Sequence, residues 1–239
     1  MGNDEAVTVA SQGPTRRRAQ GGRQRASHSL DAVVTEAVAL LDEAGEPALT
    51  FRALAARLGT GVGSIYWYVS SKDELLDRAS DHVLADVLTA TAHVGSSADP
   101  LDDVRAVAVA LFDAIAARPW LGSYFLNNAG FQPNGLMIYE RLGQQVLRLD
   151  LTPRQLYQGV SAVLGFVVGV AADLGHDAEI AAAAPTLAEA ADEWRALDPQ
   201  TYPFLHAVAE EFSTHVDAEL FRAGLDLLLD GLRQQVGRA

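Results

Sequence analysis

Three consecutive aromatic residues and a lysine shortly after them form the stretch of this sequence best suited to contacting phosphate. Tyr66, Trp67 and Tyr68 precede Lys72 by less than two turns of a helix. Tyrosine hydroxyls can hydrogen-bond to phosphate oxygens, and the lysine adds a positive charge beside the free N–H groups of a helix start. Plain core packing is the alternative, although three neighbouring residues of one helix cannot all face inward. We expect the hydroxyls of Tyr66 and Tyr68 to contact phosphate while the rings, with Trp67, pack the segment down.

A short segment before the aromatic one can place further polar side chains on the same surface. Residues 49–58 have helical apolar spacing, with Thr50 as the expected N-cap. Thr50 and Arg52 can reach phosphate, and Arg52 can also reach a guanine edge. A Gly-Thr-Gly connection leads to a second helix predicted over residues 62–69. Two short helices joined in this way satisfy the geometry of a helix-turn-helix, whose second helix enters the major groove of DNA.

The start of that second helix is rich in glycine. In the run Gly61-Val62-Gly63-Ser64, the side chains of Val62 and Ser64 are left to face bases. Each glycine weakens a helix by ~1 kcal/mol relative to alanine, so the sequence predicts a segment that is loosely ordered without DNA and tightens on binding. A phosphate-cradling nucleotide loop is the alternative, but this run follows a helix and lacks a Gly-Lys-Ser/Thr ending.

Helices must hold this motif, because the apolar residues recur at helical spacing through most of the chain. A first helix is expected from Ser29, its N-cap, to Gly45, and a fourth from a capping box at Ser70 with Asp73 or Ser71 with Glu74 to about residue 91. Further helices are predicted over 101–117, 121–128, 135–149, 153–174, 203–213 and 217–236, with some helix around 186–196 in an otherwise flexible 175–200. No strand pattern is convincing, so the predicted fold class is all-α.

Composition excludes several classes of function. The chain of 239 residues has no cysteine, which excludes disulfides, zinc-thiolate sites, iron–sulfur clusters and thiol catalysis, and fits the cytoplasm. The six histidines show no metal-ligand spacing, and no catalytic motif is present, so we expect no enzyme activity, no metal and no cofactor. The longest apolar run, residues 160–172, is too short to span a bilayer, so we expect no membrane association.

The net charge of −13 argues against a nucleic-acid partner until its distribution is considered. Residues 1–80 contribute only −1, and the remaining 159 contribute −12. Residues 1–28 carry five arginines against Asp4 and Glu5, a net charge of +3, and almost no bulky apolar residue. We expect this segment to be a disordered arm that binds DNA phosphate. The alternative is a solvated leader that makes no contact with DNA.

The same residues resemble the DNA-binding region of the tetracycline-repressor family. The resemblance lies in Leu49-Thr50, Arg52, Leu54-Ala55, Leu58-Gly59, Ile65-Tyr66-Trp67-Tyr68-Val69, Lys72 and Leu75-Leu76. The resemblance is to the tetracycline-repressor branch of the family, whose recognition helix ends in Tyr-Trp-His-Val. Tyr68 stands at the histidine position of that pattern. Residues 61–64 differ from the family pattern at positions that read bases in the family. Residues 118–121 (Arg-Pro-Trp-Leu) and 221–232 are similar to the family's junction after the fifth helix and to its last helix.

The resemblance implies a helix-turn-helix domain over 29–76 and an effector-binding and dimerisation domain over 77–239. It implies a homodimeric transcriptional repressor that binds a palindromic DNA operator and is released by a small apolar or amphipathic effector. The alternatives are a DNA-binding regulator without a small ligand and a helical protein-interaction module. The expected DNA contacts are Thr50, Arg52, Gly61, Val62, Gly63, Ser64, Tyr66, Trp67, Tyr68 and Lys72.

Two further sets of residues follow from the resemblance. Candidates for lining the effector pocket are Phe112, Trp120, Phe125, Asn128, Met137, Tyr139 and Phe166, although ordinary core packing is the alternative for each. Repeated glycine in two helices suggests close helix approach, so the expected dimer interface contains Gly165, Gly169, Leu220, Gly224, Leu228 and Gly231. His93 and Glu140 match no metal motif of the family, and no metal is expected.

Overall fold

The computed structural model describes residues 29–127, 132–174 and 185–236, and within these ranges it contains eleven α-helices, one short 3-10 helix and no strand. This confirms the all-α fold class. The helices are α1 (Leu30–Ala48), α2 (Phe51–Arg57), α3 (Val62–Ile65), α4 (Lys72–Ala90), α5 (Pro100–Ala116), α6 (Pro119–Asn127), α7 (Pro133–Val146), η1 (Leu147–Leu149), α8 (Pro153–Leu174), α10 (Leu187–Ala196), α11 (Pro203–Thr214) and α12 (Asp217–Arg233). The arm over 1–28 lies outside the described residues.

Local side-chain caps begin the helices of the N-terminal part where the sequence predicts them. The side chains of Ser29, Thr50 and Ser71 accept backbone N–H bonds three residues ahead, at 3.0–3.1 Å. Ser71 is therefore the N-cap of α4, but the Glu74 carboxylate accepts from the N–H of Ser70 rather than from that of Ser71, so the reciprocal bond of the predicted capping box is not formed. Gly45 has a left-handed φ of +69°, so α1 loses regular helical geometry where the sequence predicts its end.

The third helix is shorter than predicted. It ends at Ile65, and the aromatic residues expected to continue it to residue 69 lie in a turn. The N–H of Tyr68 bonds to the Ile65 carbonyl three residues back, at 2.9 Å, which tightens the chain into this turn. The prediction of a helix over 62–69 was therefore wrong in its second half.

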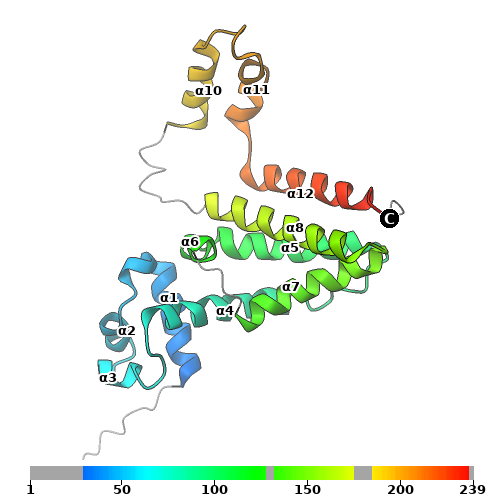
Figure 1. Cartoon of the computed structure of the whole chain (residues 1–239). Helices are drawn as coiled ribbons and strands as arrows, with labels where there is room; N and C mark the ends of the chain where they lie inside the picture. The colour runs from blue at the N-terminus through cyan, green and yellow to red at the C-terminus, as the bar shows by residue number, and fades with distance from the viewer. Residues whose placement is uncertain (1–28, 128–131, 175–184, 237–239) are drawn as a thin grey trace, which may run out of the picture.

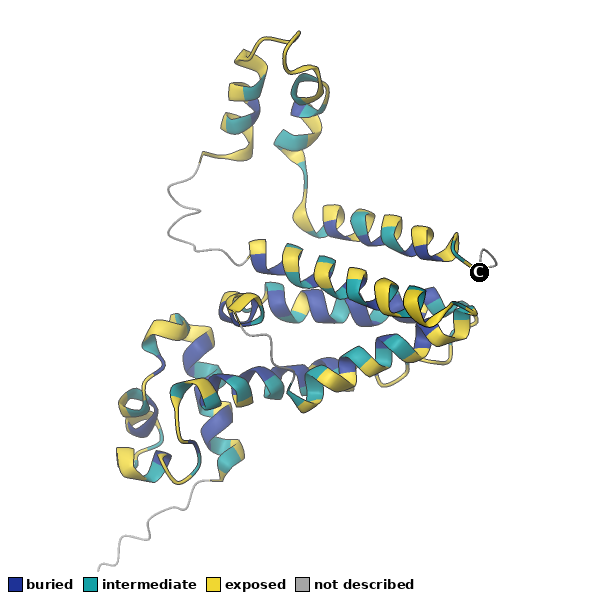
Figure 2. Cartoon of the chain, viewed as in Figure 1, coloured by how far each residue is buried: buried dark blue, intermediate teal, exposed yellow. Residues whose placement is uncertain are grey.

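The helices are arranged along an elongated molecule. Figure 1 shows α1, α2 and α3 at one end and the α10–α11 pair at the other, with α4 leading from the first group to α5, α7 and α8. The buried side chains of α5 and α8 form the centre of the core, and Figure 2 shows the corresponding dark positions on their inner faces. The buried members include Leu111, Ile115, Val163 and Val167.

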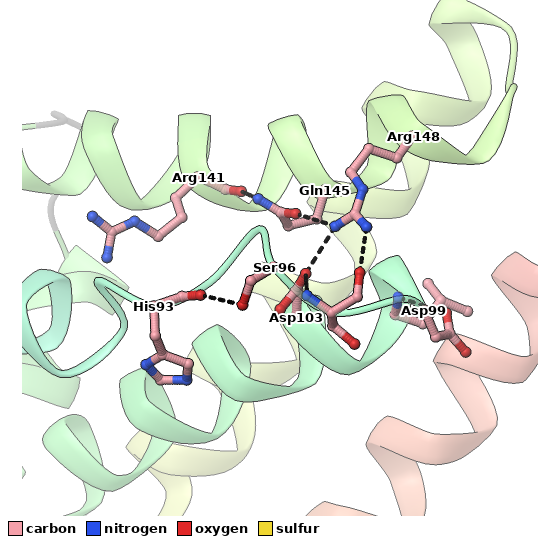
Figure 3. Close-up of polar contacts among 9 residues, drawn as sticks. His93, Ser96, Asp99, Asp103, Arg141, Gln145 and Arg148 are labelled. Carbon is pink, nitrogen blue, oxygen red and sulfur yellow. Dashed lines mark hydrogen bonds and ion pairs between the residues drawn. The ribbon is translucent and has the colours of Figure 1, made fainter.

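An arginine on η1, just after α7, binds the connection between α4 and α5. Arg148 donates to the Asp103 carboxylate at 2.8 Å, to the side-chain oxygen of Gln145 at 2.9 Å and to the Ser97 carbonyl (Figure 3). Asp103 is buried and also accepts the N–H of Ser97 at 3.3 Å. Because every charge in this cluster has a partner, we assign it a structural role.

Helix α6 packs so closely on α8 that one position requires glycine. A Cβ placed on Gly122 would lie 2.9 Å from the backbone Cα of Ala172, which cannot move aside without shifting α8. We expect Gly122→Ala to lower the free energy of unfolding by ~1–3 kcal/mol because it overpacks the core. Chemical denaturation monitored by circular dichroism measures this change.

Gly143 in α7 provides the matched control for that substitution. A Cβ on Gly143 meets no atom within 4 Å, so alanine there should raise stability by up to ~1 kcal/mol through helix propensity alone. Equal effects of the two alanine substitutions would contradict the close α6–α8 contact.

Candidate nucleic-acid interface

Helices α2 and α3 are anchored by buried side chains on one face and are exposed on another. Leu54, Ala55, Ile65 and Val69 are buried and fix α2 and α3 against the core. Gly61, Val62 and Gly63 at the start of α3 are exposed, and Ser64 is partly buried. At the start of α2, Thr50 and Arg52 are exposed as well, although the Thr50 side chain is engaged in its cap. The start of α3 and the start of α2 are therefore accessible to a partner.

The three aromatic residues behave differently from one another. Trp67 is 88% exposed and Tyr66 60% exposed, whereas Tyr68 packs partly buried against the core. The Tyr66 ring meets Phe51 edge to face, with centroids 4.8 Å apart, so its position is fixed while its surface remains open. The prediction that Trp67 packs the segment down was wrong, because the turn after Ile65 points this ring into solvent.

The glycine-rich start of α3 has no side-chain cap. Gly61 is its N-cap residue; its carbonyl accepts the Ser64 N–H at 2.8 Å, but it has no side-chain acceptor for the other free N–H groups of the first turn. We keep the prediction that residues 61–64 are loosely ordered alone and tighten on DNA. Amide hydrogen exchange should slow at these residues when DNA is added, and exchange that is equally slow in both states would contradict the prediction.

Lys72, the expected phosphate contact, is already ion-paired. Its Nζ lies 3.0 Å from Glu46 Oε1 and 3.0 Å from the Glu46 carbonyl oxygen. Arg57 is paired with Glu36 and Glu43, and these carboxylates, Glu43 first, raise the pKa of its guanidinium. Arg52 makes no ion pair with any part of the chain that the structure describes, so it is the cation of these two helices most directly available to DNA.

Helix α4 begins with a carboxylate that is held ionised. The N–H of Ser70 donates to Glu74 at 2.8 Å, its hydroxyl donates at 2.7 Å, and Arg78 adds a third contact. These contacts, the backbone bond first, lower the pKa of Glu74 from 4.5 to about 2. Because the folded state prefers the ionised form, this contribution to stability is complete above pH 4.5 and is lost as the pH falls toward 2.

Glu74→Gln should therefore make the protein less sensitive to acid. At neutral pH the variant should melt a few degrees below wild type, since it loses the charged contacts to Ser70 and Arg78. Between pH 4.5 and 2 the two melting temperatures should converge. A constant difference over this range, measured by thermal unfolding in a pH series, would contradict the assignment of the low pKa to Glu74.

Hydrogen bonds join α1 and α4 to the helices that follow them. Trp120 Nε1 donates to Asp42 at 2.7 Å, and the Tyr124 hydroxyl donates to Asp77 at 2.7 Å. Burial, with Asp77 second, raises the pKa of Tyr124, so its hydroxyl stays protonated as a donor. The backbone N–H of Asn134, in α7, donates to Asp81 at 2.7 Å. Helices α6 and α7 thus hold both α1 and α4.

The candidate pocket residues fall into different surroundings. Phe112 stacks on Phe221 with centroids 3.8 Å apart, and Phe166 stacks on the same ring at 5.6 Å. Trp120 is buried with its N–H engaged by Asp42, Phe125 and Tyr139 are partly buried, and Met137 is 51% exposed. Asn128 lies outside the described residues. Three of these rings therefore serve packing or helix-to-helix contact in the chain alone.

The candidate interface residues divide into two groups. A Cβ on Gly224 would lie 2.4 Å from Phe166 Cζ, so this glycine serves packing between α8 and α12 within the chain. Gly165, Gly169 and Gly231 meet nothing within 4 Å, and Leu220 is 58% exposed. Leu228 is partly buried. Close approach by another chain is therefore possible at the three open glycines.

An apolar stripe of α12 continues this open surface. Leu227, which the sequence analysis did not single out, is 76% exposed on the same helix as Leu220 and Gly231. Helix α8 is long and apolar enough to cross a membrane by length and composition alone, yet only 33% of its most apolar stretch is buried in the protein. Figure 2 shows exposed positions running along both helices. Among the described residues, no group of three or more acidic or histidine side chains could hold a metal ion.

Comparison with known proteins matches two segments of the chain to family models. Residues 33–79 match the family described as bacterial regulatory proteins, tetR family, and residues 98–236 match the tetracyclin repressor-like C-terminal domain. The chain belongs to the TetR family. The resemblance noted in the sequence is thereby confirmed, and the protein is a transcriptional regulator of this family rather than an enzyme.

Individual members of the TetR family match over most of their length. The HTH-type transcriptional repressor DrrR1 of Streptomyces coeruleorubidus is 30% identical, over 88% of this chain and 79% of its own. The structure of SCO7222, a TetR from Streptomyces coelicolor, matches with a TM-score of 0.75 and 37% identity, covering 87% of this chain and 99% of that one. ActR from Streptomyces coelicolor, in complex with actinorhodin, matches with a TM-score of 0.76 and 25% identity, covering 89% and 98%.

Proposed function

We propose that this TetR-family regulator represses transcription as a homodimer, with α3 of each copy in the major groove of a palindromic operator. The observation that carries the proposal is the exposure of Val62, Tyr66 and Trp67 in the short segment of chain that separates Arg52 from Lys72. It combines groups that can contact bases with groups that can contact phosphate. The similarity to the repressor DrrR1 supports repression rather than activation. A regulator of this kind acts in the cytoplasm.

The dimer interface we propose consists of α8 and α12. Its surface contains the open glycines Gly165, Gly169 and Gly231 and the exposed leucines Leu220 and Leu227. A second copy would cover the apolar face of α8 that the chain alone leaves in water. A two-fold dimer presents two recognition helices to two half-sites about one helical turn apart.

We propose that a small apolar or amphipathic effector binds among the helices after α4 and releases DNA. The similar ActR is known in complex with actinorhodin, which supports a small-molecule ligand for this chain as well. Any movement of α6 or α7 is passed on by the bonds from Trp120, Tyr124 and Asn134 to α1 and α4. The effector can release DNA only by binding the released state better, by ~1–3 kcal/mol in typical cases.

DNA binding tests this proposal through Lys72. In mobility-shift titrations across a salt series, Lys72→Ala should weaken binding to all sequences. It should also reduce the slope of log affinity against log salt concentration by ~1. Ser64→Ala should instead act on sequence preference, because Ser64 faces bases. Unchanged affinity and salt slope in Lys72→Ala would contradict the placement of the interface, and a chain that binds no DNA would contradict the function.

A further inference from the structure

The charge around the two short helices opposes DNA binding. Residues 29–76 carry three basic side chains, Arg52, Arg57 and Lys72, against seven acidic ones, a net charge of −4. DNA repels carboxylates that lie near it as strongly as it attracts ammonium groups. Two of the three cations are already neutralised by carboxylates of α1. What these carboxylates do to DNA affinity depends on how firmly each cation is held.

The two ion-paired cations are held in different ways. Arg57 donates both Nη groups to Glu43, at 2.7 and 2.8 Å, and its Nε to Glu36, so this pair joins α2 firmly to α1. Lys72 has one carboxylate partner among the described residues, Glu46, and both side chains are more than one-third exposed. An exposed single contact of this kind contributes at most about 1 kcal/mol, so Lys72 can exchange its partner.

The backbone at the end of α1 holds Glu46 close to Lys72, the first residue of α4. Gly45, with its φ of +69°, breaks regular helical geometry just before Glu46. The N–H of Leu49 donates to the Glu46 carbonyl oxygen at 3.1 Å, and Lys72 Nζ contacts that same oxygen. Lys72 therefore has two contacts with Glu46, one with its backbone carbonyl and one with the carboxylate that neutralises it.

We infer that Glu46 competes with DNA phosphate for Lys72 and thereby limits the affinity of the protein for DNA of any sequence. The inference rests on the proposed phosphate contact of Lys72. A carboxylate and a phosphate both bind an ammonium through charge-assisted hydrogen bonds, so one can replace the other. When Lys72 turns to phosphate, Glu46 is left near DNA without a counter-charge and takes up a cation from solution. This uptake offsets part of the cation release that drives DNA binding.

Glu46→Gln tests the inference, because it removes the charge and keeps the backbone carbonyl contact. With the full-length chain and a short DNA duplex of mixed sequence, affinity at low salt should rise about fivefold. The slope of the logarithm of affinity against the logarithm of salt concentration should steepen by up to ~1. Asp73→Asn is the matched control: it removes an exposed carboxylate beside Lys72 that makes no ion pair with the described part of the chain, and it should raise affinity less.

Lys72→Ala separates competition from general charge repulsion. In a Lys72→Ala background, Glu46→Gln should change affinity little, because no ammonium remains to be released. The inference would be overturned if Glu46→Gln raised affinity equally in both backgrounds, or if it gave no gain with Lys72 present. In either case, a loss of affinity in the single Lys72→Ala variant would still support the proposed DNA contact. If Lys72→Ala changes neither affinity nor slope, the contact is wrong and the inference with it. Matching melting temperatures show that the variants are folded.

Discussion

Replacing Leu227 with glutamate is expected to convert the dimer into monomers and to abolish operator binding. Leu227 is 76% exposed on α12, within the apolar stripe that we assign to the interface. Two-fold symmetry places the substitution in the interface twice, and burying an unpaired carboxylate costs several kcal/mol. The dimer dissociation constant should rise about a thousandfold, which sedimentation velocity at micromolar concentration would detect.

Leu147→Glu is the control for this experiment. Leu147 is another exposed leucine, on η1 and outside α8 and α12, so glutamate there should leave both dimer and DNA binding intact. A Leu227→Glu variant that remains dimeric, or a wild-type chain that is a monomer at the same concentration, would contradict the proposed interface. Loss of DNA binding without loss of the dimer would place Leu227 in a different role.

Deleting residues 1–28 is expected to weaken DNA binding strongly and to flatten its salt dependence. This segment carries a net charge of +3, whereas residues 29–76 carry −4, so most of the positive charge available for phosphate lies in the arm. Each phosphate contact contributes ~0.9 to the salt slope, and two arms act in one dimer. Affinity at physiological salt should fall about 100-fold, measured by fluorescence anisotropy with labelled duplex.

Replacing the five arginines of the arm by glutamine separates charge from length. If the arm acts through its charge, this variant should match the deletion in both affinity and salt slope. An arm that acts only as a solvated leader would leave both quantities unchanged in either variant. That outcome would place the whole electrostatic contribution on Arg52 and Lys72.

The features that could be predicted from the sequence depend on residues close together in the chain. The caps at Ser29, Thr50 and Ser71 each bridge three residues, and the break at Gly45 needs only its own backbone. The end of α3 was mispredicted because apolar residues recur at helical spacing at positions 62, 65, 66 and 69, while the bond from the Tyr68 N–H to the Ile65 carbonyl tightens the chain into a turn. Local pattern therefore located the motif but not the direction of Trp67.

Contacts between distant segments could not be predicted in the same way. The Lys72–Glu46 pair joins residues 26 apart, and the Trp120–Asp42 bond joins residues 78 apart. Nothing in the spacing of these residues identifies their partners, since the partners are set by how α1 packs on α4 and α6. The same holds for α12, where the sequence suggested Leu228 but the rotation of the helix exposes Leu227.

Selection of binding sites from a random-sequence DNA duplex library tests the central claim most directly. With the full-length protein, the account predicts enrichment of a palindrome whose half-sites lie about one helical turn apart. The enriched duplex should bind two chains, as measured by sedimentation of the complex. Enrichment of sequences without two-fold symmetry, binding of a single chain, or no enrichment at all would contradict a dimeric operator-binding regulator.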